Sequence, residues 1–190
     1  MSDFSKAFLI TMGNEGGYNS GVGEAETYCG IDRSMNPNWS GWKVIDGLKP
    51  LSVSQMNAKL AINAEIQKGI RDFYQVNYWN PYKLGLVNNQ QVAENLFDCS
   101  VNPCIDGVAE VMQKATNAAI IAGGRKSGLI SVDKQIGDKT IAAINSVAPR
   151  ALYEAINAIR LSNYYNRGEQ TPSMKSWVPI WINRLHNYQS

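Results

Sequence analysis

The feature that most constrains this chain is the spacing of its apolar residues, which recur about every three or four positions in one segment after another. No stretch alternates apolar and polar residues over a useful length, so the pattern gives no sign of strands. Gly and Pro residues mark the ends of the predicted helices. We expect helices over roughly 3–15, 52–79, 89–100, 106–122, 138–147, 149–167 and 179–186. The sequence therefore predicts an all-α fold with short connections.

Charge and cysteine content narrow the classes of function. The chain has 18 Lys and Arg against 16 Asp and Glu, so it lacks the basic excess typical of proteins that bind nucleic acid or an anionic membrane. Three cysteines leave one unpaired, and the single histidine, His186, lies far along the chain from them. A zinc site is therefore not expected. We expect a monomer with no metal, no cofactor and no nucleic-acid partner.

The N-terminal residues indicate in which compartment the chain is expected to be made. Met1-Ser2-Asp3 is not followed by a basic region and a long apolar run, so no secretory signal is predicted. No segment is both apolar enough and long enough to span a bilayer. We expect a protein made in the cytoplasm, which would need another route to reach a target outside it.

Glu15 stands at the end of the first predicted helix, within Met12-Gly13-Asn14-Glu15-Gly16-Gly17-Tyr18. It continues the apolar stripe of that helix, and the two glycines after it suit a helix C-terminus. The negative end of the helix dipole and partial burial both disfavour a charged carboxyl there. Because a carboxyl held protonated can act as a general acid, Glu15 is the first candidate catalytic residue. The alternative is an ordinary helix end with a solvated Glu.

Several ordered blocks of sequence resemble glycoside hydrolase family 108, the lysozyme-like N-acetylmuramidases of phage and bacterial origin that include secretion activator proteins. The blocks are Glu15-Gly16-Gly17-Tyr18, Glu26-Thr27-Tyr28-Cys29-Gly30-Ile31, Pro37-Asn38-Trp39, Gly41-Trp42, Leu96-Phe97-Asp98, Val101-Asn102, Gln113, Ile136–Thr140, Arg160 and Tyr164-Tyr165. The resemblance implies a lysozyme-like helical fold, a compact single globule with a catalytic cleft. It also implies cleavage of the β-1,4 bond between N-acetylmuramic acid and N-acetylglucosamine in peptidoglycan, with Glu15 as the catalytic acid.

The resemblance further implies two regions, a hydrolase region over 1–88 and a peptidoglycan-binding region over 89–190 packed on it, acting on the cell wall in the periplasm. The sequence departs from the family in three places. Asn19–Ala25 lacks the family's Asp and Gly pair, Val101-Asn102-Pro103-Cys104 departs from Val-Asn-x-Gly, and Val132-Asp133-Lys134 departs from Val-Asp-Gly. These losses leave a second interpretation open, a catalytically inactive peptidoglycan-binding or secretion-associated module of the same fold.

Residues 19–50, a long segment rich in Gly, Asn, Ser and Pro, are where we expect the second carboxyl group of a glycosidase. Glu26 is the first candidate, followed by Glu24 and Asp32, and the alternative for all three is a solvated loop acid. Thr27 is a candidate for orienting a water molecule, and its alternative is a hydroxyl that caps the backbone.

Four further residues are candidate sugar ligands. Tyr18 and Tyr28 have aromatic faces on which sugar rings can stack, and their alternative is core packing. Asp98 and Asn102, one helical turn apart, can present polar groups to sugar hydroxyls. Their alternative is a set of hydrogen bonds at the helix end.

Overall fold

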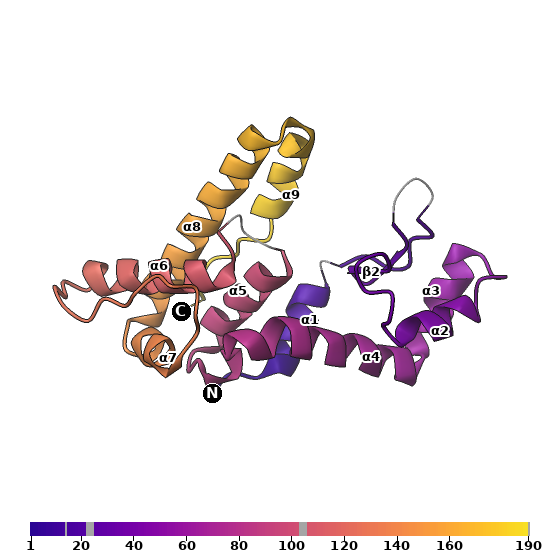
Figure 1. Ribbon diagram of the computed structural model, residues 1–190, viewed down its shortest axis with the longest axis horizontal. Helices are drawn as coiled ribbons and strands as arrows, with labels where there is room; N and C mark the ends of the chain where they lie inside the picture. Colours follow the sequence, from indigo (N-terminus) through magenta and orange to yellow (C-terminus); the bar gives the residue numbers. More distant parts are fainter. Residues whose placement is uncertain (14, 22–24, 103–105, 190) are drawn as a thin grey trace. The chain divides into compact units, whose positions relative to one another are not determined.

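The computed structural model describes residues 1–13, 15–21, 25–102 and 106–189, which are mostly helical, as Figure 1 shows. This confirms the all-α fold class. The α-helices are α1 (Phe4–Met12), α2 (Gly41–Asp46), α3 (Val53–Ile62), α4 (Ala64–Tyr74), α5 (Gln90–Val101), α6 (Val108–Ala122), α7 (Asp138–Asn145), α8 (Pro149–Gln170) and α9 (Val178–Ile182). Shorter turns of π- or 3₁₀-helix are η1 (Gln75–Trp79), η2 (Asn80–Tyr82), η3 (Leu84–Leu86) and η4 (Pro172–Trp177).

Contacts divide the chain into two compact units. Residues Met12–Val76 form one unit, which we call the inserted unit, and Met1–Thr11 join Asn77–Ser190 to form the other, which we call the split unit. This division rests on contacts within the fold and assigns no activity to either unit. The expected division of activities between 1–88 and 89–190 stays a prediction.

The split unit has an aromatic cluster that explains why α1 belongs to it. The ring of Phe4 lies 5.6 Å from the ring of Phe97 on α5 and 5.5 Å from that of Trp79 in η1, measured between centroids. All three side chains are buried. Within the same unit α8 packs against α5, α6 and α9 (Figure 1). Burial of these apolar faces supplies most of the stabilisation of such helices.

The inserted unit contains a short β-hairpin that the sequence pattern did not predict. Strand β1 (Thr27–Tyr28) pairs antiparallel with β2 (Ile31–Asp32), and the turn residues Cys29 and Gly30 have φ values of 46° and 75°. Positive φ at both central residues is typical of the tight turns that match the twist of a hairpin. Two-residue strands are too short to show alternation. A two-stranded hairpin does not change the fold class.

Some predicted helix boundaries are confirmed and others are shifted. Ser52 and Gln55 form the expected capping box of α3, and Pro149 is the first residue of α8. The helix expected over 52–79 is interrupted at Asn63, whose extended backbone (ψ 108°) ends α3 and whose side chain caps α4 by accepting from Ile66 N at 3.0 Å. A side-chain cap of this kind replaces one missing bond of the first helical turn.

Candidate active site

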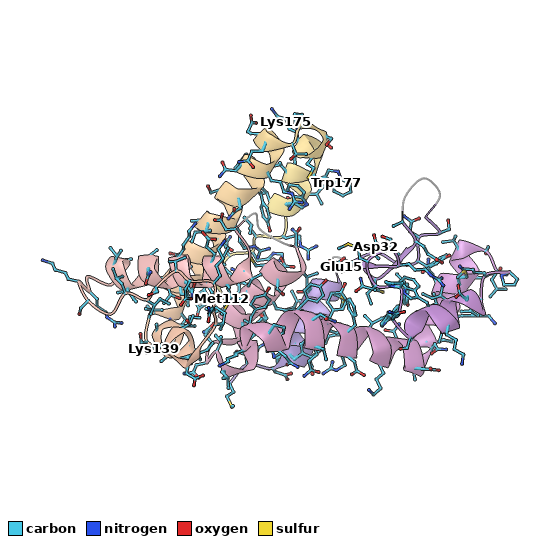
Figure 2. All side chains as sticks on the ribbon, viewed as in Figure 1. Glu15, Asp32, Met112, Lys139, Lys175 and Trp177 are labelled. Atoms are coloured by element: carbon cyan, nitrogen blue, oxygen red, sulfur yellow. The ribbon has the colours of Figure 1, made fainter. Side chains whose placement is uncertain are left out.

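Glu15 follows α1 in a turn, with its N–H donating to the carbonyl of Met12 at 3.2 Å. Figure 2 labels it beside the segment that carries β2. Its half-buried carboxyl lies against the hairpin turn, since a methyl group on Gly30 would be 2.6 Å from Glu15 Oε2. The hydroxyl of Tyr74 holds the same turn by donating to the carbonyl of Cys29 at 2.6 Å. A glycine at position 30 therefore allows the carboxyl to approach this closely.

The Glu15 carboxyl lines an open depression of about 350 Å³ within the inserted unit. The other lining residues are Gly16, Gly17, Tyr28, Cys29, Asn57, Ala61 and Gln67. Of the described residues that line it, Glu15 is the only acid. The sequence placed Glu15 and Tyr28 in one site, and the structure brings them together here.

The two other ionisable groups of the depression are neutral near pH 7. Burial raises the pKa of the Cys29 thiol, a hydrogen bond with Tyr28 lowers it, and the nearby Glu15 charge raises it, with a net increase. Burial is also the main cause that raises the pKa of the Tyr28 hydroxyl well above its usual range. The depression therefore combines one carboxyl with uncharged polar groups.

Glu26 belongs to a separate network of charges. Its Oε1 accepts from the hydroxyl of Tyr18 at 2.8 Å, its Oε2 lies 2.9 Å from Arg33 Nη1, and Lys49 Nζ lies 3.3 Å from Oε1. Burial alone raises the pKa of this carboxyl, but the hydrogen bonds from Tyr18, Arg33 and Lys49 outweigh it, so the pKa is lower than usual. Glu26 is thus a charged carboxylate, and it is not among the residues that line the depression.

The remaining loop candidates differ in what they contact. Thr27 forms backbone hydrogen bonds with Asn19 in both directions, at 2.9 and 3.1 Å. Because successive side chains of a strand point to opposite faces, Thr27 and Tyr28 face opposite ways, and only Tyr28 lines the depression. The Asp32 carboxylate accepts from the hydroxyl and the backbone N–H of Ser34, which stabilises the turn after β2. Glu24 lies outside the described residues.

Asp98 and Asn102 both lie in the split unit. Asp98 is only 7% exposed, and its two oxygens face Arg160 Nη2 at 2.5 Å and Arg184 Nη2 at 2.7 Å. Burial raises the pKa of this carboxyl, but the charges of Arg160 and Arg184 and their hydrogen bonds bring it below its usual value. Asn102 donates to the hydroxyl of Tyr164 at 3.3 Å. These contacts give both residues a structural role, and their role as sugar ligands stays a prediction.

Residues 8–103, just over half of the chain, match the family described as glycosyl hydrolase 108. The chain belongs to this family. The matched segment contains Glu15, the β-hairpin and all of α5, so the resemblance read from the sequence blocks is confirmed. No curated protein matches the chain.

A solved structure gives independent support for the fold. The chain is similar to the structure of Brucella abortus SagA with a TM-score of 0.54 and 20% sequence identity. The alignment covers 97% of this chain and 96% of that one. At this identity the likeness shows the fold alone.

Two further observations concern the described part of the chain. It contains no group of three or more His, Cys, Asp or Glu side chains that could hold a metal ion. Over the same residues, no helix is both long enough and apolar enough to cross a membrane.

Three residues that bring polar side chains to the depression were not expected there from the sequence. Cys29 was quoted only as part of a family block, while Asn57 and Gln67 lie on α3 and α4. Polar residues at helical spacing usually face solvent, so nothing in their pattern indicates a site.

Proposed function

We propose that the chain is a peptidoglycan hydrolase of the N-acetylmuramidase type with Glu15 as its general acid. The observation that carries the proposal is the position of the Glu15 carboxyl on the wall of an open depression whose other polar groups are uncharged. A sugar polymer needs such an open, polar surface, and hydrolysis needs one carboxyl that delivers a proton. Membership of glycosyl hydrolase family 108 supports the class of reaction.

In the proposed reaction, the Glu15 carboxyl gives its proton to the oxygen that links N-acetylmuramic acid to the next N-acetylglucosamine. The bond between that oxygen and C1 of N-acetylmuramic acid breaks, and positive charge develops on the ring. A water molecule adds to C1 and returns a proton to the Glu15 carboxylate or to solvent, which balances the hydrolysis. Thr27 remains the proposed residue that orients this water and Glu26 the proposed charged carboxylate, although neither is among the residues that line the depression.

Replacement of Glu15 tests the proposal. The Glu15→Gln variant keeps the size of the side chain but has no proton to give, so release of soluble fragments from purified peptidoglycan should fall by at least about a hundredfold. Glu65→Gln, which changes an exposed acid on α4 of the same unit, is the matched control and should keep wild-type activity. A Glu15→Gln variant as lytic as wild type would overturn the mechanism.

One observation favours a second candidate function, a catalytically inactive module that binds peptidoglycan. No second carboxyl among the described residues lines the depression beside Glu15, and the charged Glu26 is already paired with Arg33 and Lys49. A wild-type protein that binds purified cell walls without releasing fragments would establish this alternative. If the chain is lytic, Glu26→Gln tests whether Glu26 contributes to the reaction. Removal of its charge should lower the rate of lysis only if Glu26 is the partner carboxylate.

The proposed site of action is the cell wall, reached from the cytoplasm by a separate export route, and the proposed form is a monomer. Tyr18 and Tyr28 are proposed to contribute to sugar binding in the inserted unit. Asp98 and Asn102 are proposed to do so in the split unit, in addition to their structural contacts.

A further inference from the structure

The side-chain amide of Asn57 has a fixed orientation at the depression. Its Oδ1 accepts a hydrogen bond from the backbone N–H of Tyr18 at 2.8 Å. Because an N–H requires an acceptor, this bond distinguishes the oxygen of the amide from its nitrogen. Among the described residues, Asn57 Nδ2 has no hydrogen-bond partner. Every buried side-chain nitrogen or oxygen in the same part of the chain has a hydrogen-bond partner, so Nδ2 is not buried. Nδ2 therefore remains accessible as a donor where Asn57 lines the depression.

The side-chain amide of Gln67 is fixed in the opposite sense. Its Nε2 donates to the carbonyl of Leu60 at 3.0 Å and to the hydroxyl of Tyr28 at 3.2 Å. A backbone carbonyl can only accept, so the group facing Leu60 must be the nitrogen. Both N–H groups of Gln67 are thereby used. Its Oε1 has no partner within the described part of the chain and remains available as an acceptor at the depression.

The depression thus presents one amide donor and one amide acceptor, each fixed by a backbone partner. An acetamido group has the complementary pair, a carbonyl oxygen that accepts and an N–H that donates. A C2 hydroxyl also has a donor and an acceptor, but both belong to one oxygen, whereas the acetamido group carries them on two separate atoms. A hydroxyl can therefore pair with both amides only if they converge on a single point. Polar groups left unpaired in a site are a strong source of discrimination between substrates.

We propose that Asn57 and Gln67 are specificity-determining residues that recognise the 2-acetamido group of an N-acetylated amino sugar, with Asn57 Nδ2 donating to its carbonyl and Gln67 Oε1 accepting from its N–H. This inference rests on the proposed function and names the chemical group of the substrate that the same site recognises. It assigns α3 and α4 a role in selecting the sugar, beyond the proton transfer assigned to Glu15.

Two neutral β-1,4-linked trisaccharides test the inference, tri-N-acetylchitotriose and cellotriose, which differ at C2 of each sugar. Titration calorimetry on the full chain should show wild type binding the acetylated sugar about tenfold more tightly, as expected for two net hydrogen bonds. Asn57→Asp keeps the acceptor for Tyr18 but loses the donor, and Gln67→Met loses the acceptor. Each variant should reduce that preference by about three- to tenfold.

Matched controls separate recognition from folding. Asn63→Asp makes the same chemical change at an amide that caps α4 outside the depression, and Lys68→Met changes the exposed residue beside Gln67. Both should leave the preference within about twofold of wild type, and thermal unfolding should show that all four variants fold.

Three outcomes would overturn the inference: wild type that binds neither sugar, wild type that binds both equally, or folded Asn57→Asp and Gln67→Met variants that keep the wild-type preference. Lysis of purified peptidoglycan by the same wild-type preparation distinguishes a failure of this inference from a failure of the proposed function. A lytic wild-type protein with no acetamido preference refutes only the assignment of Asn57 and Gln67.

Discussion

Among single residues, Gly30 determines how closely the Glu15 carboxyl can approach the hairpin turn. Its φ of +75° is costly for any residue with a Cβ, and a methyl group there would lie 2.6 Å from Glu15 Oε2 and 2.7 Å from the Tyr74 hydroxyl. We predict that Gly30→Ala lowers the free energy of unfolding by about 1–2 kcal/mol. Displacement of the carboxyl should also lower wall lysis at least about tenfold. Thermal unfolding and a lysis assay measure the two effects.

Gly107→Ala is the control for this prediction. Gly107 also has a positive φ, +78°, but a methyl group there would meet no atom of the described residues within 4 Å. The control should therefore lose stability and keep activity. If Gly30→Ala behaves in the same way, Gly30 has a purely conformational role.

The sequence predicted only part of the candidate site, and the difference has a physical cause. Glu15 and Tyr28 were predicted because both lie in short contiguous blocks. Asn57 and Gln67 were not, because what a polar helical residue faces depends on tertiary packing. The charge balance of Glu26 also depends on folding, which brings Arg33 and Lys49 to it from other parts of the loop.

Among the helices, Asp98 joins α5 to α8 and to the segment after α9 through Arg160 and Arg184. Arg160 is only 1% exposed, so loss of the opposing negative charge leaves a buried cation without its counterion. We predict that Asp98→Asn lowers the free energy of unfolding by about 3–5 kcal/mol, measured by denaturant unfolding. Asp138→Asn removes an acid that pairs with Lys83 and is 95% exposed, and it should leave the stability nearly unchanged.

The pH dependence of that stabilisation has a definite sign. The pKa of Asp98 is lower in the folded chain than the value of about 3.9 in an unfolded one, so below that pH the unfolded chain binds more protons. The contribution of Asp98 is complete above about pH 4 and is lost as the pH falls through the folded pKa. The stability difference between wild type and Asp98→Asn should therefore shrink in acid. A difference that stays constant down to pH 2 would contradict an ionic role.

Most helix positions could be predicted from the sequence, but neither α2, which lies within the segment 19–50 where no helix was expected, nor the interruption between α3 and α4 could be. The capping box of Ser52 and Gln55 and the initial Pro149 are local signals, and both are confirmed. The interruption at Asn63 was not predicted, because apolar spacing continues through it from Leu60 to Ile70. Only the cap on Ile66 N shows that two helices meet there.

At the scale of the whole molecule, the division into two units predicts which unit a core mutation destabilises. Phe4 is 6% exposed and packs on Phe97 and Trp79, so Phe4→Ala should lower the stability of the split unit by about 3–5 kcal/mol. Amide hydrogen exchange should accelerate in α5 and remain near wild type in α4. Leu9→Ala, on the same helix but with Leu9 72% exposed, is the control and should change neither. Equal acceleration in α4 would show that the units unfold together.

The split unit also sets an order of events during synthesis of the chain. Residues Met12–Val76 can make all contacts of the inserted unit before the ribosome has added Phe97. Helix α1, although it precedes the inserted unit in the chain, must wait for Trp79 and Phe97 before its apolar face has its native partners. A segment made before Glu15 therefore reaches its final neighbours only after the inserted unit is complete, and its apolar face has no native partners while the segment with Glu15 can already fold.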